Sequence, residues 1–150
     1  MIGDALWNLG GSSTSQGLYA DDYYTFERGT TVYSGHSTTW TGKIALMYPS
    51  DYMYAGDLSI CSLDGSGWSS DQTNCRDTSW LRAILADQWT LTPYASSSVD
   101  LFFVNDSGYV NYFNRANYIS ATRPVLFLKS NVQITGGDGS QNNPFTLSVE

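Results

Sequence analysis

Apolar residues along the chain recur at two different spacings, which predict helices in some segments and strands in others. Residues 18–28 have the spacing of a short helix, with Asp21 and Asp22 near its start and Gly29 just after its end. Acidic residues favour the positive end of a helix, and glycine is a common C-terminal cap. A second amphipathic helix is predicted at 78–88, where the apolar positions are Trp80, Leu81, Ile84 and Leu85.

Short runs of β-branched and aromatic residues predict strands. We place them at 30–33, 43–48, 89–92, 99–104, 109–112 and 125–128. Asp106-Ser-Gly108 supplies the hairpin turn between two of these strands. The tail from residue 132 to residue 149 suggests a final loop and an edge strand. Two short helices packed on a small antiparallel sheet with long loops make the expected fold class α+β.

The composition indicates one globular domain covering residues 1–150. A chain of 150 residues with 41% hydrophobic residues is long and apolar enough to form a core, and its glycine and serine clusters mark no boundary. Charged residues make up 14%, compared with about 25% in typical soluble domains. The 11 tyrosines and 5 tryptophans supply flat amphipathic rings, which either fill a β-rich core or contact a partner.

The net charge of −7 argues against two classes of partner. Phosphate binding needs clustered cations, and seven scattered lysines and arginines do not provide them, so we expect no nucleic acid. The same charge disfavours an anionic membrane surface. No apolar run reaches about 18 residues, so we expect no membrane insertion by this segment. No signal peptide is visible at Met1, which either starts the protein or follows removal of an export or anchor segment.

Cys61 and Cys75 are the two cysteines of the chain, and they flank a loop rich in Gly, Ser and Asp. No further cysteine completes a zinc site, and the spacing is not Cys-x-x-Cys. We predict a disulfide between them, which stabilises the fold by about 3 kcal/mol. A disulfide and a low content of charge indicate an exported protein, extracellular or on the cell surface. Two unpaired buried thiols in a cytosolic protein are the alternative.

Residues 111–120 are the leading candidate for a binding surface. Aromatic rings and side-chain amides lie side by side in this span, and their combination is typical of carbohydrate stacking and of antibody paratopes. The candidate ligand contacts in and before the segment are Asn105, Asn111, Tyr112, Phe113, Asn114, Asn117 and Tyr118. The alternative is an ordinary polar loop with two rings packed inward.

Residues with catalytic or metal-binding chemistry are few. His36 is the single histidine and lies in a turn-like context, and no Gly-x-Ser-x-Gly motif of a nucleophile elbow is present. Asp138–Asn143 is rich in oxygen ligands, but a solvated turn explains it better than a calcium site. Arg123 is expected to be a structural arginine paired with Glu27 or Asp51. We therefore expect no catalytic residue, no bound metal and no cofactor.

Two motifs in the second half of the chain resemble a known group of proteins. The first is Trp89-Thr-Leu-Thr-Pro93. The second is Arg123-Pro-Val-Leu-Phe-Leu128, which follows a strand, a Ser-Gly-Tyr-Val turn and a polar loop. Together with Trp7-Asn-Leu-Gly-Gly11 and Trp40-Thr-Gly-Lys-Ile-Ala-Leu-Met-Tyr48, they resemble Gly/Tyr-rich surface proteins of Gram-positive gut-type bacteria over nearly the whole chain. Some proteins of this group look like pilin or pseudopilin heads.

More distantly, the C-terminal half resembles the C-type-lectin-like fold in its formylglycine-generating-enzyme branch, which also includes variable proteins diversified by retroelements. In that branch the closing strand follows a sequence-tolerant ligand loop. The resemblance implies that neighbouring residues widen the binding surface, namely Tyr94, Ser97, Asp100 and Phe102. Formylglycine-generating enzymes need a cysteine pair in their C-terminal region, whereas Cys61 and Cys75 lie too early.

These observations predict a non-enzymatic, adhesin- or receptor-like surface domain. It presents a variable aromatic and Asn-rich loop to a glycan or protein on another cell or surface. The alternative is the head domain of a minor pilin or another structural cell-surface subunit, which binds sister subunits. An enzyme of the formylglycine-generating branch is the least supported interpretation. The first two interpretations differ in self-association, which a structural subunit requires.

Overall fold

A three-stranded antiparallel sheet forms the centre of the fold. Its strands are β4 (Gln88–Pro93), β5 (Asp100–Val104) and β6 (Val110–Arg115), in the spatial order β4-β5-β6. They confirm the three strands that the apolar runs predict in this region. β6 is longer than expected and contains the first half of the segment 111–120. That half is therefore strand, not loop.

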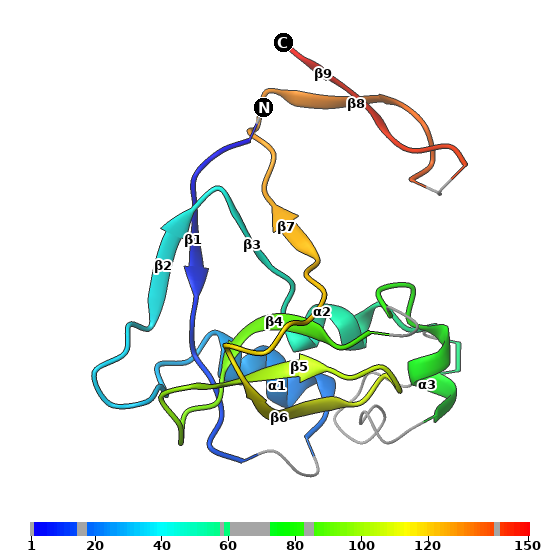
Figure 1. Ribbon diagram of the computed structural model, residues 1–150. Coiled ribbons are helices and arrows are strands. Elements are labelled where there is room, and N and C mark those ends of the chain that lie inside the picture. The colour runs from blue at the N-terminus through cyan, green and yellow to red at the C-terminus, as the bar shows by residue number, and fades with distance from the viewer. Residues whose placement is uncertain (1, 15–17, 58, 61–72, 83–85, 140–141) are drawn as a thin grey trace.

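The computed structural model describes residues 2–14, 18–57, 59–60, 73–82, 86–139 and 142–150. Within these residues it contains three short helices and several small antiparallel sheets, which confirms the α+β class. Figure 1 shows a body, made of the sheet β4-β5-β6 and the helices, and above it a set of paired strands.

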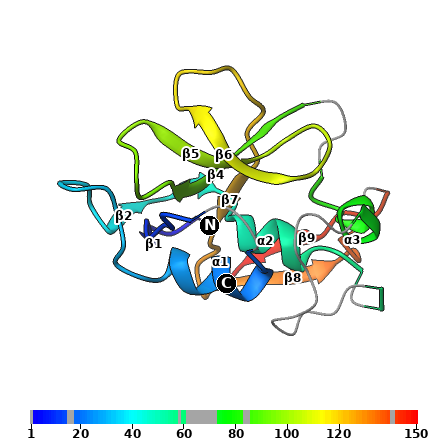
Figure 2. The ribbon, with the colours of Figure 1, turned by 90° about the horizontal axis from the view of Figure 1, so that it is seen from below.

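Two helices pack against each other and cover one side of the sheet, as Figure 2 shows. Their bounds are α1 Ala20–Glu27, which confirms the first predicted helix, and α2 Pro49–Tyr54. Both begin in the same way. The backbone N–H of Tyr19 donates to Asp22 Oδ2, and that of Tyr48 donates to Asp51 Oδ2, each at 2.9 Å. A carboxylate in the first turn thus fixes the start of each helix and complements its dipole.

The second predicted helix is wrong. Among the described residues, α3 spans Thr73–Thr78 and ends where the helix predicted at 78–88 begins. Residues 79–82 are irregular, and Ser79 Oγ donates to the carbonyl of Tyr52 at 2.9 Å. Residues 83–85 lie outside the described part of the chain. Tertiary hydrogen bonds to α2 therefore outweigh the helical spacing of the apolar residues here.

Two further strand predictions need correction. Residues 30–33 form no strand: the Thr31 carbonyl accepts one bond from Gly11 N at 2.9 Å, and the chain then turns at Gly35, whose φ is +84°. The strand predicted at 43–48 is confirmed for its central residues, which form β3 (Ile44–Leu46). It stops early because Pro49 begins α2.

The core lies between the sheet and the helices. Phe102 of β5 is 0% exposed, and its ring packs edge-on against Tyr23 of α1 with 5.4 Å between centroids. The same cluster contains Met47, Tyr52, Met53, Cys75 and Val104. Cys61 lies outside the described residues, so the disulfide between Cys61 and Cys75 stays a prediction.

Three chain segments rise from the body, and each pairs with the other two (Figure 1). β1 pairs with β2, β3 pairs with β7, and Ile2 forms an antiparallel bridge with Leu128. The strands not yet bounded are β1 Ala5–Asn8, β2 Thr39–Gly42 and β7 Pro124–Leu126. We call this part, residues 2–8, 39–46 and 124–128, the stalk. β7 confirms the beginning of the strand predicted at 125–128.

Residues 131–139 and 142–150 form a hairpin that we call the arm. β8 (Val132–Gly136) pairs with β9 (Thr146–Val149), so the tail contains two strands where a loop and one strand were expected. Every residue of β9 is exposed. Figure 1 shows the arm projecting from the top of the stalk, away from the sheet and the helices.

Gly108 supplies the turn between β5 and β6, as the Asp-Ser-Gly sequence predicts. Its φ is +84°, and a Cβ placed there would lie 2.9 Å from Tyr52 Oη and 3.1 Å from Arg82 Nε. We expect Gly108→Ala to lower the free energy of unfolding by about 2–4 kcal/mol, because the backbone cost and a steric conflict add. Urea denaturation measures this loss.

Gly35→Ala is the matched control. Gly35 has the same φ of +84° but no atom within 4 Å of the added Cβ, so its loss is expected to be about 1–2 kcal/mol. Equal losses for the two variants would contradict a tightly packed turn at Gly108.

Candidate binding groove

The residues predicted to bind a ligand do not form one surface. Tyr94 and Tyr112 are half-buried, and their rings contact each other with 4.3 Å between centroids. Both rings also lie near Phe102, at 5.9 and 6.3 Å. Phe102 belongs to the core, so its predicted contact with a ligand is wrong: the surrounding aromatic rings cover it. Of the segment 111–120, one ring, that of Tyr112, thus packs inward, whereas the alternative interpretation expects two.

The turn after β6 lies on the surface. Asn117 and Tyr118 of this turn are exposed, Tyr118 at 60%, and so is Asn111 of β6. The side chains of Phe113 and Asn114 lie outside the described part of the chain. These exposed groups remain candidates for contact with a partner.

The other predicted contacts have local structural roles. Asn105 Oδ1 accepts a hydrogen bond from Tyr109 N at 2.8 Å, which stabilises the β5–β6 turn. Ser97 Oγ accepts one from Val99 N at 3.3 Å in the connection between β4 and β5. Asp100 is half-buried at the start of β5, where its carbonyl accepts a bond from Tyr94 N at 3.1 Å.

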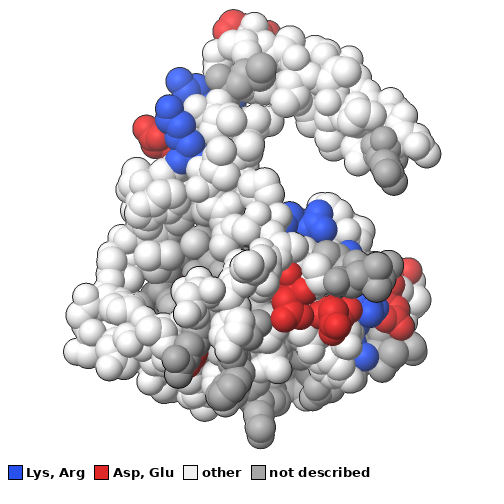
Figure 3. Space-filling model, in the orientation of Figure 1, with Lys and Arg blue, Asp and Glu red and all other residues white. Residues whose placement is uncertain are grey.

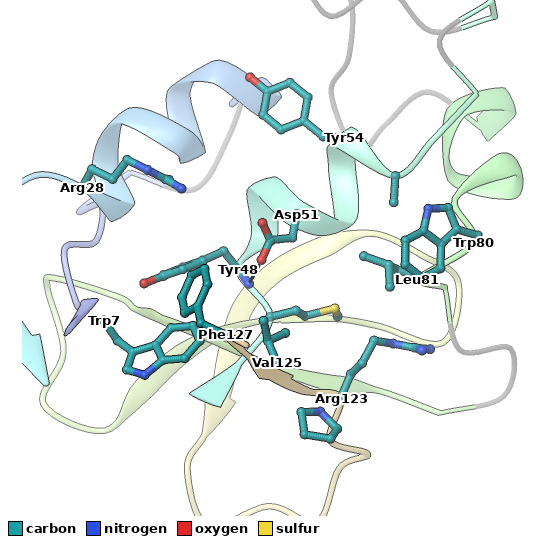
Figure 4. Close-up of a pocket in the computed structure, with 13 residues that line it drawn as sticks. Trp7, Arg28, Tyr48, Asp51, Tyr54, Trp80, Leu81, Arg123, Val125 and Phe127 are labelled. Atoms are coloured by element: carbon teal, nitrogen blue, oxygen red, sulfur yellow. Dashed lines mark hydrogen bonds between the residues drawn. The ribbon is translucent and has the colours of Figure 1, made fainter. Parts of the chain in front are cut away.

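A different region contains a groove of about 760 Å³, which falls within the usual size of a ligand site. It lies where the stalk meets α2 and the end of α1, as Figure 4 shows. Ten of its 13 lining residues are uncharged, and most of these are aromatic or aliphatic. We call it the aromatic groove.

Aromatic rings stand at both ends of the aromatic groove. At one end the ring of Phe127 packs on Trp7 with 5.0 Å between centroids, and Trp7 Nε1 donates to the Gly42 carbonyl at 2.9 Å. At the other end Trp80 is 75% exposed beside the buried Leu81. Tyr48 also lines the groove, with its ring near Phe127 and Trp7 at the first end (Figure 4). Exposed ring faces in a recess favour stacking with a ligand.

Two arginines and one aspartate supply the charge of the groove. The Arg28 guanidinium lies 3.5 Å above the Tyr24 ring and 3.2 Å from Glu27 Oε2. Arg123 Nε donates to Gln88 Oε1 at 3.4 Å. The predicted pairing of Arg123 with Glu27 or Asp51 is therefore wrong. The cause is the register of the chain, because Ala121, two residues before Arg123, bridges to Gln88 at the start of β4.

Glu27 is a buried carboxyl group behind Arg28, and sequence reasoning gave it no role beyond a possible partner of Arg123. It is 0% exposed and accepts hydrogen bonds from Ser50, at 2.9 Å from the backbone N and also from the hydroxyl. Burial raises the pKa of Glu27 to about 7, although the bonds from Ser50 and the charge of Arg28 oppose the shift. Glu27 therefore takes up a proton near neutral pH.

His36, Asp138 and Asn143, which were weighed for catalysis or metal binding, do not line the groove. His36 is exposed in a turn, where its backbone N–H donates to the Tyr33 carbonyl at 3.0 Å. Asp138 N and Gly139 N donate to the Asn143 carbonyl at 3.0 and 3.2 Å, in the turn of the arm. The described residues include no group of three or more His, Cys, Asp or Glu placed to hold a metal ion. No helix in the described ranges is long and apolar enough to cross a membrane.

The fold and the groove define an α+β protein with an aromatic, arginine-flanked recess and a projecting arm. No family model, no curated protein and no solved structure matches the chain.

Proposed function

We propose that the protein is a non-enzymatic binding domain of the cell surface, and that the aromatic groove holds its ligand. One observation carries this proposal: two separated aromatic ends, Phe127 and Trp80, flank a recess of about 760 Å³ with an arginine on either side. A largely apolar recess with a few polar groups is the usual form of a binding site. A C-type-lectin-like arrangement, in which β7 closes the fold after the loop 116–123, is part of the proposal.

The polar groups near the groove suit binding better than catalysis. Asp51 accepts the N–H bond that starts α2, and Glu27 is covered by Ser50 and Arg28. These carboxylates are occupied by structural bonds. The groove thus offers ring faces and guanidinium groups, which recognise apolar segments and carboxylates. The ligand class that fits is an extended chain, of a protein or an acidic glycan, with apolar faces and a carboxylate.

A structural surface subunit is the second candidate function. The uncovered arm favours it, because an exposed hairpin with apolar side chains is stabilised by contact with another molecule. The two candidates are compatible when the ligand of the groove is itself part of an assembly.

Trp80→Ala tests the groove. Trp80 is 75% exposed, so its loss leaves the fold intact, and we expect about tenfold weaker binding to whichever probe of a glycan array or bacterial surface screen the wild type binds. Trp40→Ala, a half-exposed tryptophan of β2 outside the groove, is the control and keeps wild-type affinity.

A paired variant, Asn117→Ala with Tyr118→Ala, examines the turn after β6. If the paired variant keeps wild-type affinity and Trp80→Ala loses it, the result supports the groove as the binding site. The reverse pattern places recognition on the turn, where the sequence alone predicts it, and rejects the groove.

A further inference from the structure

The arm has one apolar and one polar face. The cross-strand pairs Val132–Val149 and Ile134–Leu147 place four apolar side chains on the same face of the hairpin. Ile134 is 61% exposed, and Leu147 and Val149 are also exposed. Gln133 pairs with Ser148 on the opposite face. An amphipathic two-stranded hairpin is marginally stable in water unless its apolar face is covered.

No described residue of the same chain covers this apolar face. The stalk is closed just before the arm begins, because Ile2 bridges to Leu128 and Gly3 N donates to the Phe127 carbonyl at 3.3 Å. At the start of the arm, Val132 N donates to the Lys129 carbonyl at 3.0 Å. Phe127 itself lines the aromatic groove. Because the arm lies apart from the body of its own chain, a second molecule can cover its apolar face. Figure 3 shows the open hollow between the projecting arm and the body.

The arm and the groove are complementary in charge. Residues 130–150 contain two carboxylate side chains, Asp138 and Glu150, and no lysine or arginine. The groove contains Arg28, Arg123 and Asp51, so two cations outnumber one carboxylate there, within a chain whose net charge is −7. Opposite charges at the two surfaces favour their contact over contact with the acidic remainder of the molecule.

From these observations we infer that the arm of one copy docks, apolar face inward, into the aromatic groove of a second copy. This inference rests on the proposed function and names its partner. The contact joins two different surfaces, so it is heterologous: two copies exchange arms reciprocally, or successive copies form a chain. Each copy has one arm and one groove, so every arm in the assembly has one groove to occupy.

Self-association of the full chain tests the inference, measured by sedimentation over about a hundredfold range of concentration. Leu147→Asp alters the apolar face of the arm and Trp80→Glu alters the groove. Each is expected to weaken association about tenfold or more, because burying either side chain contributes to the contact. Ser148→Asp on the polar face of β9 and Trp40→Glu on β2 are matched controls that keep wild-type association. Circular dichroism verifies that all four variants fold.

Mixing the two defective variants is the decisive experiment. Trp80→Glu retains its arm and Leu147→Asp retains its groove, so the mixture is expected to form a complex that neither variant forms alone. A wild type that is monomeric at every concentration overturns the inference. Association that depends on Leu147 but not on Trp80 also overturns it, because the arms then contact each other.

The outcomes distinguish failure of this inference from failure of the proposed function. If external ligand binding depends on Trp80 while the wild type stays monomeric, the groove remains a binding site and the inference about the arm is wrong. If neither ligand binding nor association depends on Trp80, both are rejected.

Discussion

Replacing Phe102 by alanine is expected to lower the free energy of unfolding by about 3–5 kcal/mol, which is typical for removing a buried aromatic ring. The ring is 0% exposed and lies among Tyr23, Tyr94 and Tyr112, with centroid distances of 5.4, 5.9 and 6.3 Å. Its removal leaves a cavity between sheet and helix and deletes three aromatic contacts. Urea denaturation at constant pH measures the change.

Tyr118→Ala is the comparison for Phe102→Ala. Tyr118 is 60% exposed on the turn after β6, so its loss is expected to change the free energy of unfolding by about 0.5 kcal/mol or less. Similar values for the two variants would show that Phe102 does not lie in the core. The sequence alone assigns both residues to ligand contact, and the pair separates their roles, since Phe102 stabilises the fold and Tyr118 is exposed to a partner.

Glu27 is expected to make the protein less stable as the pH rises. Burial raises its pKa from 4.5 to about 7, so between these values the folded state binds more protons than the unfolded state. The free energy of unfolding then falls with increasing pH. The loss is about 3 kcal/mol across this interval, because each unit of pKa difference corresponds to about 1.4 kcal/mol. Above pH 7 the contribution is constant.

Urea denaturation at a series of pH values measures this effect, and Glu27→Gln isolates it. The amide keeps an oxygen that accepts the bond from Ser50 N but does not titrate, so the decline between pH 4.5 and 7 is expected to flatten. Glu150→Gln removes an exposed carboxylate and keeps the wild-type slope. Parallel curves for wild type and Glu27→Gln would contradict a buried, protonated Glu27.

Much of the fold can be predicted from the sequence because local patterns and tertiary structure agree. The strands β4, β5 and β6 follow apolar runs, and α1 follows helical spacing with acids at its start. The helix predicted at 78–88 fails because Ser79 and Trp80 bond to the end of α2, which leaves Trp80 exposed at the rim of the groove and Leu81 buried. Apolar spacing alone does not distinguish these two environments.

The groove itself has no signal in the sequence. Its walls come from β1, the end of α1, α2, residues 80–81 and residues 123–127, which the fold brings together from distant positions. No short motif links Trp7 to Trp80. The aromatic and amide residues at 111–118 gave a clear local pattern, but the strand register turns Tyr112 toward the core and leaves Asn111 outside. Register is a property of the whole sheet.

The pairing of Ile2 with Leu128 determines how the molecule responds to tension. β1 runs down from the top of the stalk and β7 runs up to it, so both leave their antiparallel pairing at the same end (Figure 1). A force that separates Ile2 from Leu128 there would first break their bridge and the bond from Gly3 N to the Phe127 carbonyl, and would then peel β1 from β2 and β7 from β3 one bond at a time. The stalk would therefore open at low load, while the sheet and helices below bear little strain.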